Sequence, residues 1–156
     1  MGEARLHVVF GTGQVGGALA AHLAGLGVAV RAVSRHRPPV LAGGTDWRAA
    51  DVTDPEAAAD AAKGASVVYQ CVNAPYTQWP ERFPPLQRGV LAAAERTGAL
   101  LVALANLYGY GPAGGRPMTE ALPLAATTVK GATRAAMTAE LLAAAEAGRV
   151  RLAIGR

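Results

Sequence analysis

The hydrophobic residues of this chain fall into two kinds of stretch that follow one another along its length. Short, continuously apolar runs are typical of strands buried in a parallel sheet, and longer stretches carry apolar residues at helical spacing. The pattern predicts six strands, at residues 6–10, 28–33, 47–50, 67–72, 99–105 and 150–154. Strands and helices therefore alternate from one end of the sequence to the other.

Four helices are predicted between the strands, and local signals mark several of their ends. Val15, Leu19 and Leu23 recur at helical spacing ahead of Gly27, a residue that suits the end of a helix. Asp54 can cap the next helix, because a proline follows it at the first helical position. The predicted helices cover residues 15–26, 55–63, 85–97 and 127–147, and residues 76–85 are predicted to form a loop.

This alternation predicts an α/β fold, a three-layer doubly wound parallel sheet of the Rossmann type. Right-handed crossovers among six strands give the strand order 3-2-1-4-5-6. With 156 residues, the chain has the length of about one domain, so residues 1–156 are expected to form one nucleotide-binding unit. Ligands on such sheets bind at the carboxyl ends of the strands where the strand order reverses. The expected site therefore follows Phe10 and Val72.

A glycine-rich turn follows the first strand and opens the first helix, with the sequence Gly11-Thr12-Gly13-Gln14-Val15-Gly16. Gly11 permits a tight turn, Gly13 lets the backbone approach a pyrophosphate, and Gly16 allows close packing of helix on strand. The helix amino terminus then faces the phosphates. The strand–turn–helix context is the one this motif requires. We therefore predict a dinucleotide site, the alternative being a glycine-rich turn without a ligand.

The end of the second strand bears on the choice of dinucleotide. An acidic residue at this position would bind the ribose hydroxyls of NAD and repel a 2′-phosphate. The sequence instead has Ser34, Arg35 and Arg37, a hydroxyl and two guanidinium groups able to clamp a phosphate. NADP is therefore predicted in preference to NAD, and the alternative is a solvated basic turn.

Two further strand ends supply candidate contacts to the dinucleotide. Asp51 could accept a hydrogen bond from the adenine amino group while the backbone of Val52 contacts the ring, although Asp51 could equally serve as a turn residue. Asn73 and Ala74 directly follow the fourth strand and could line the nicotinamide ribose region, or simply end that strand. These four residues complete the candidate cofactor site.

Composition excludes several other classes of protein. Hydrophobic residues make up 51% of the chain, too many for a disordered protein, yet no apolar run reaches the roughly 20 residues that cross a bilayer. The net charge is +4, but the basic residues are spread along the sequence, so no nucleic-acid partner is predicted. No His, Cys and carboxylate set has metal-ligand spacing, so no metal is predicted. Cys71 is expected to be a buried, unreactive thiol.

The first residues of the sequence indicate a cellular location, and its amino-acid composition indicates a type of organism. Residues 1–5 lead directly into the first strand without a basic leader or a cleavable apolar segment, so a cytoplasmic location is expected. Arginine supplies 13 of the 15 basic residues, and alanine, glycine and proline are abundant. This composition is typical of GC-rich bacteria.

Taken together, these motifs resemble those of the extended and atypical short-chain dehydrogenase/reductase family, the NAD-dependent epimerase/dehydratase group. The resemblance covers essentially the whole chain, although the glycine spacing differs by one residue from the family's usual turn. The matching segments are the glycine turn, residues 51–54, Asn73-Ala74, Leu107-Tyr108-Gly109, residues 117–120 and Pro123.

The resemblance also implies a catalytic site from which this sequence departs. The family uses a Tyr-x-x-x-Lys pair, in which the lysine lowers the tyrosine pKa for proton exchange. Lys130 aligns with the lysine and is a candidate for the nicotinamide ribose, with an exposed helix lysine as the alternative. The tyrosine position is Ala126, and the family's serine or threonine falls on Leu104. Tyr108 is the candidate stand-in for the proton donor, with a packing role as its alternative.

The resemblance implies a parent protein that is an NAD(P)-dependent oxidoreductase or epimerase-like enzyme acting on an unidentified small molecule. It also implies a carboxy-terminal substrate domain, which is absent from this chain, and it leaves open a homodimer paired through residues 85–97 and 127–147. The predicted function is the NADP(H)-binding domain of such an enzyme, with the usual Ser and Tyr positions replaced. The alternative is a module that binds NADP(H) without catalysis, as a sensor or scaffold.

Overall fold

The computed structural model describes residues 5–156. Residues 1–4, on which the expectation of a leaderless amino terminus partly rests, lie outside the described residues. Six strands form one parallel sheet in the order β3-β2-β1-β4-β5-β6, which confirms the predicted fold class. The strands are β1 (Leu6–Phe10), β2 (Val30–Ser34), β3 (Thr45–Ala49), β4 (Ala65–Gln70), β5 (Leu100–Leu104) and β6 (Arg151–Gly155).

The register of the sheet brings three strand ends together. Phe10 at the end of β1 pairs with Val33 of β2 and with Gln70 of β4. The strand order reverses between β1 and β4, because β2 and β3 lie on one side of β1 and β4, β5 and β6 on the other. The carboxyl ends of these central strands therefore form the edge at which a ligand is expected.

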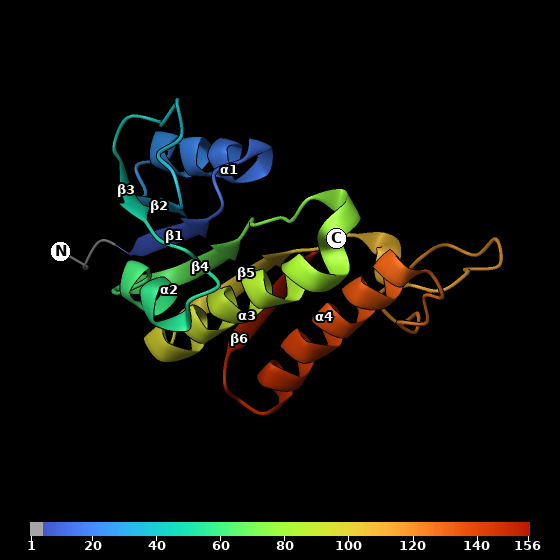
Figure 1. Cartoon of the computed structure of the whole chain (residues 1–156). Helices are drawn as coiled ribbons and strands as arrows, with labels where there is room; N and C mark the ends of the chain where they lie inside the picture. The colour runs from blue at the N-terminus through green and yellow to red at the C-terminus, as the bar shows by residue number, and fades with distance from the viewer. Residues whose placement is uncertain (1–4) are drawn as a thin grey trace.

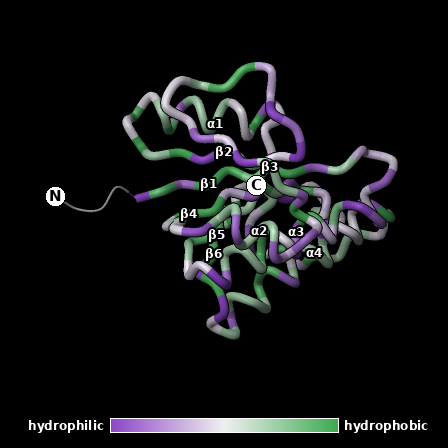
Figure 2. Tube along the Cα trace, turned by 60° about the vertical axis from the view of Figure 1, so that its left-hand side comes forward, coloured by the Kyte–Doolittle hydropathy of each residue, from purple (hydrophilic) through white to green (hydrophobic). Residues whose placement is uncertain are grey.

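Helices lie on both faces of the sheet. They are α1 (Gln14–Gly25), α2 (Pro55–Ala61), α3 (Trp79–Thr97) and α4 (Val129–Glu146), with short 3₁₀ turns η1 (Tyr76–Gln78) and η2 (Leu107–Gly109). Helix α1 covers one face, and α2, α3 and α4 cover the other (Figures 1 and 2). Each face has its own apolar core: Val9 packs with Leu23 on the α1 side, whereas Val8 and Phe10 pack with Leu141 on the other.

The prediction for the start of α3 was wrong, because the helix begins at Trp79 and the predicted loop is largely helical. Pro84 and Pro85 lie inside the helix; neither has an N–H to donate, a feature that normally disfavours a helix interior. Trp79 and Phe83 are both buried and pack against Met137 of α4. Apolar burial on this face thus outweighs the lost hydrogen bonds.

The predicted cap of α2 is confirmed, and the structure adds a capping residue at the start of α4. Asp54 accepts hydrogen bonds from the backbone N–H groups of Glu56 and Ala57 at the start of α2. Thr128 caps α4 by accepting from the N–H of Gly131 at 3.1 Å. The predicted helix at residues 127–147 therefore begins two residues later than expected, because Thr128 has extended backbone angles.

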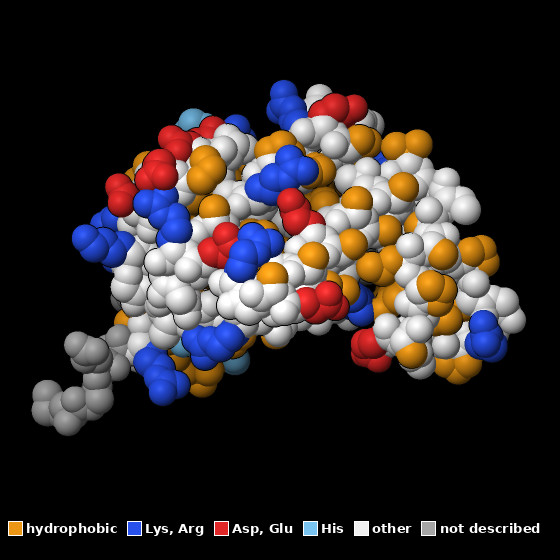
Figure 3. Space-filling model, turned by 90° about the horizontal axis from the view of Figure 1, so that it is seen from below, with side chains coloured by type: hydrophobic (Ala, Val, Ile, Leu, Met, Phe, Trp, Pro, Cys, Tyr) orange, Lys and Arg blue, Asp and Glu red, His pale blue; other side chains and the backbone are white. Residues whose placement is uncertain are grey.

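The surface shows no concentration of one charge on the face seen from below. There, Lys and Arg side chains lie among Asp and Glu side chains (Figure 3). Within residues 5–156, none of the helices is both long enough and apolar enough to span a membrane.

Candidate functional site

The glycine turn lies tightly against the end of β4. Gly11 has a φ of +95°, and its N–H donates to the carbonyl of Val33 at 2.9 Å. A Cβ on Gly11 would lie 2.7 Å from the carbonyl carbon of Cys71, and a Cβ on Gly16 would overlap the carbonyl oxygen of Gly11. Gly13 differs, because a Cβ there would meet no atom within 4 Å. The backbone at Gly13 is therefore open to a ligand.

The amino terminus of α1 has the features of an anion site. Gly13 is its N-cap residue, so no side chain caps the helix, and no acidic residue lies in the first turn. The first N–H groups of a helix have no partner within the helix, and the helix dipole makes this end positive. An uncapped end beside an open glycine fits a phosphate group.

Two cavities flank this turn, and we name them by the neighbouring strands. The β2-side cavity, of about 280 Å³, is lined by Phe10, Gly11, Thr12, Gly13, Val33, Ser34, Arg35, Ala50, Asp51, Val52, Cys71, Val72, Asn73 and Leu86. The β5-side cavity, of about 320 Å³, is lined by Gly13, Gln14, Val15, Cys71, Val72, Asn73, Trp79, Phe83, Leu104, Ala105, Asn106 and Arg134. Gly13 and residues 71–73 belong to both, so the glycine turn and the end of β4 form a common wall.

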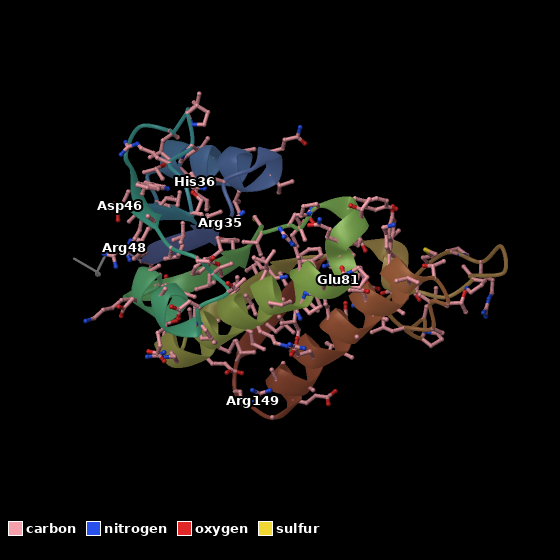
Figure 4. All side chains as sticks on the ribbon, in the orientation of Figure 1. Arg35, His36, Asp46, Arg48, Glu81 and Arg149 are labelled. Carbon is pink, nitrogen blue, oxygen red and sulfur yellow. The ribbon has the colours of Figure 1, made fainter. Side chains whose placement is uncertain are left out.

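Only part of the basic turn after β2 faces the β2-side cavity. Arg35 lines the cavity with Ser34 and takes part in none of the ion pairs among residues 5–156; Figure 4 labels it beside His36. The hydroxyl of Ser34 donates to the carbonyl of His36 at 2.7 Å and accepts from Trp47 Nε1 at 3.1 Å. Arg37 lies over the Trp47 ring, 5.7 Å from its centroid. Of the two arginines predicted to bind a phosphate, Arg35 lines the β2-side cavity and Arg37 does not.

Asp51 and Val52 line the β2-side cavity. Asp51 Oδ1 accepts from the backbone N–H of Thr53 at 3.0 Å and from its hydroxyl at 2.7 Å. These hydrogen bonds, assisted by the charge of Arg35, hold the pKa of Asp51 below its usual value. Asp51 is therefore a carboxylate, and its hydrogen bonds with Thr53 also stabilise the local turn.

Asn73 and Ala74 have different surroundings. Asn73 lies at the wall shared by the two cavities, where its side-chain oxygen accepts from the backbone N–H of Ala74 at 2.9 Å. Ala74 is buried in the apolar cluster of Trp79 and Phe83, and it lines a neighbouring cavity together with Arg35. Of this pair, Asn73 is the better placed beside the glycine turn.

The two candidate catalytic residues lie in a separate cavity, which we call the Tyr108 cavity. It is lined by Tyr76, Leu107, Tyr108, Tyr110, Gly111, Pro112, Ala126, Thr127, Thr128, Val129 and Lys130. None of these residues lines the β2-side or β5-side cavity. The structure therefore brings Tyr108 and Lys130 to one cavity and the glycine turn to two others.

Contacts within the Tyr108 cavity do not lower the pKa of Tyr108. Lys130 Nζ lies over the ring of Tyr76, 4.0 Å from its centroid. A hydrogen bond with Tyr76 raises the pKa of Tyr108 above its usual value, and the charge of Lys130 only partly opposes this effect. A tyrosine that exchanges protons near neutral pH needs a lowered pKa.

Ala126 and Leu104, the two positions at which the sequence departs from the family pattern, line different cavities. Ala126 precedes Thr128, the cap of α4, whereas Lys130 lies within the first turn of that helix. A side chain at position 126 is therefore not one helical turn from Lys130 on a common helix face. Leu104 ends β5 and lines the β5-side cavity.

Arg134 is the site residue that sequence reasoning missed. It lies four residues after Lys130 on α4 and lines the β5-side cavity beside the glycine turn. No local pattern in the sequence signals this position, because its burial depends on Leu104 and Phe83, which are far away in the sequence. Trp79 and Phe83 are buried and also line this cavity, so they serve both packing and the cavity wall.

Cys71, half-buried between the two cavities, is expected to react slowly with alkylating reagents. Burial raises the pKa of its thiol to about 11. Because only the thiolate reacts, alkylation by iodoacetamide at pH 8 should be on the order of 100-fold slower than for free cysteine, and it should accelerate as the pH rises. The measurement is mass-spectrometric labelling over time, with urea-unfolded protein as the control. A folded rate equal to the unfolded rate would contradict this expectation.

Parallel strands in this order, a glycine turn at the reversal point and an open helix amino terminus define a dinucleotide-binding Rossmann domain. The chain belongs to the NAD(P)H-binding family, whose profile matches residues 11–147. It is therefore an NAD(P)-binding domain, and the resemblance to epimerase/dehydratase-type proteins is confirmed. No curated protein matches the chain.

Solved structures share this fold. A UDP-galactose 4-epimerase is 25% identical, with a TM-score of 0.80 over 96% of this chain and 54% of that protein. A UDP-glucose 4-epimerase from Brucella ovis in complex with NAD is 18% identical, with a TM-score of 0.82 over 97% and 51%. A UDP-N-acetylglucosamine 4-epimerase from Bacillus cereus is 14% identical, with a TM-score of 0.81 over 96% and 52%. The chain thus spans about half the length of these proteins.

Proposed function

We propose that this chain is the NADP(H)-binding domain of an epimerase/dehydratase-like oxidoreductase. The adenosine half of the dinucleotide would occupy the β2-side cavity, with the pyrophosphate on the amino terminus of α1 and the nicotinamide half toward the β5-side cavity. A bound nicotinamide dinucleotide supplies hydride transfer, while the chain binds and orients it. The wall of Gly13 and Asn73 shared by the two cavities supports this path.

The observation that carries the preference for NADP is the position of Arg35. It lines the β2-side cavity at the end of β2 and has no ion-pair partner among the described residues. A guanidinium at this position can bind a 2′-phosphate through charge-assisted hydrogen bonds. The residue that would repel a 2′-phosphate, an acidic side chain at the end of β2, is replaced by Ser34.

Calorimetric titration with NADPH and NADH tests this preference. We expect Arg35→Ala to weaken NADPH binding by about 10- to 100-fold, the contribution of a hydrogen bond to a charged group, while NADH affinity changes little. Arg48→Ala is the matched control, because Arg48 on β3 donates to the carbonyl of Asp60 and lies outside the β2-side cavity. Equal losses for NADPH and NADH would contradict a 2′-phosphate contact, and the absence of binding of either would overturn the proposed function.

The remaining parts of the proposal concern the whole protein. Substrate binding would be supplied by a carboxy-terminal domain that these residues do not include, and the protein would act in the cytoplasm. A homodimer through α3 and α4 stays a prediction, and size-exclusion chromatography with light scattering measures it directly. The substrate would be a small molecule.

A second candidate, a module that binds NADP(H) without turnover, is favoured by the position of Tyr108 and by its pKa. Tyr108 and Lys130 line a cavity that shares no residue with the glycine turn, and the pKa of Tyr108 is raised. Under this candidate, the full-length protein shows no turnover, and Tyr108→Phe leaves the dinucleotide affinity unchanged. A fall in turnover at unchanged affinity would return Tyr108 to a catalytic role.

A further inference from the structure

Arg134 is a buried cation whose hydrogen-bonding capacity is largely unused. Its side chain extends from α4 and lines the β5-side cavity, and the residue is only 4% exposed. One terminal nitrogen donates to the carbonyl of Leu104 at 3.3 Å, and the other lies 3.8 Å from the sulfur of Met137. The guanidinium lies over the Phe83 ring, 4.6 Å from its centroid. Its Nε has no partner.

The charge of Arg134 is not balanced by any carboxylate within residues 5–156. It takes part in none of the ion pairs there. A guanidinium carries five N–H donors, and burying a cation without an anion is unfavourable. The aromatic faces of Phe83 and Trp79 offset part of this cost. Burial also lowers the pKa of Arg134, the direction expected for a cation held away from water.

Hydrogen-bond donors also line the β5-side cavity. The side-chain oxygens of Asn73 and Asn106 accept from the backbone N–H groups of Ala74 and Tyr108, and the amide N–H groups of both side chains remain able to donate. The uncapped amino terminus of α1 contributes backbone N–H groups at Gln14 and Val15. No Asp or Glu lines this cavity. Its walls therefore combine a buried cation with hydrogen-bond donors.

We propose that Arg134 is the anchor of an oxyanion-binding site in the β5-side cavity, which takes a carboxylate or phosphate group. Such a group can accept two parallel hydrogen bonds from the guanidinium and further ones from the asparagine amides. The oxyanion belongs either to the pyrophosphate of the dinucleotide or to an acidic small-molecule substrate. The second source deepens the proposed function and rests on it, whereas the anion site itself does not require a dinucleotide.

This assignment separates the two basic residues of α4. Lys130, one turn earlier, lies over Tyr76 in the Tyr108 cavity, whereas Arg134 lines the cavity that contains the glycine turn. The cation of α4 that acts beside the proposed dinucleotide path is therefore Arg134.

Anion binding by the dinucleotide-free protein is the first test. Inorganic phosphate and malonate are titrated at constant ionic strength, and the rise in Tm reports binding. Wild-type protein should respond to at least one of them, and Arg134→Met should raise the Kd at least tenfold. Arg149→Met is the control, because Arg149 follows the far end of α4 (Figure 4) and pairs with Glu95 at the surface. The control loses the same charge and should match wild type.

Arg134→Lys is the second variant, in case the methionine variant does not fold. It keeps the charge and removes the planar fork, so the phosphate Kd should rise by about 3- to 10-fold. A wild type that responds to neither anion, or variants that respond like wild type, would overturn the proposal.

Titration with NADPH identifies the source of the oxyanion. A tenfold or larger loss of NADPH affinity in Arg134→Met assigns the site to the pyrophosphate. Unchanged NADPH affinity with a lost malonate response assigns it to an acidic substrate. If wild-type protein binds no NADPH, the proposed function fails while the anion titration still decides the role of Arg134.

Discussion

Gly16→Ala is expected to lower the free energy of unfolding by about 3 kcal/mol or more and to abolish measurable dinucleotide binding. The new Cβ would overlap the carbonyl oxygen of Gly11 and lie 3.1 Å from the Cβ of Cys71. Backbone atoms cannot turn aside as the end of a flexible side chain can, so α1 must move away from β4. Urea denaturation measures the stability loss, and calorimetry with NADPH measures binding.

Gly13→Ala is the matched control for this effect, because it adds the same methyl group to the same turn. A Cβ at Gly13 meets no atom within 4 Å, so the free energy of unfolding should change by less than about 1 kcal/mol. Binding should still weaken at least tenfold, since the methyl group would fill space that the pyrophosphate needs. Wild-type affinity in Gly13→Ala would show that phosphates do not approach the turn there.

Gln87→Leu is expected to cost about 2–3 kcal/mol, the usual penalty for leaving buried polar groups without partners. Gln87 is buried on α3, and its amide donates to the carbonyl of Met137 at 2.8 Å and to Glu140 Oε2 at 3.0 Å. Its oxygen accepts from Gln70 of β4 at 3.4 Å. One side chain thus joins α3, α4 and the sheet. Thermal unfolding should show a fall in Tm of roughly 5–10 °C.

Arg88→Ala tests whether this loss comes from burial or merely from a broken contact with α4. Arg88 is the next residue on α3 and also contacts Glu140, through an ion pair of 3.0 Å, but its side chain is 64% exposed. Exposed ion pairs contribute about 0–1 kcal/mol, so the Tm should hardly change. Similar losses for the two variants would contradict the importance of the buried amide.

Much of the fold could be predicted from the sequence because its signals are local. Continuous apolar runs predicted the strands, and their alternation with helices predicted the sheet order. Asp54 predicted the start of α2 because its side chain hydrogen-bonds within the next three residues. The glycine turn could be recognised for the same reason, since the crowded backbone next to Gly11 and Gly16 leaves no room for a side chain.

The beginning of α3 was not predictable in the same way. Local rules place a helix start at Pro85, whereas the burial of Trp79 and Phe83 against Met137 extends the helix back to Trp79. Met137 is far away in the sequence, so no local pattern reports the contact. Packing between α3 and α4 therefore decided this boundary.

For the candidate site, the sequence by itself determined the backbone of the proposed dinucleotide site, namely the glycine turn, the open amino terminus of α1 and the basic end of β2. Only the tertiary structure decided which side chains meet there. It turned Arg35 toward the β2-side cavity while Arg37 lies over Trp47, and it brought Arg134 into the β5-side cavity, away from Lys130. The reason is that backbone conformation depends mainly on neighbouring residues, whereas side-chain burial depends on which helices and strands pack together.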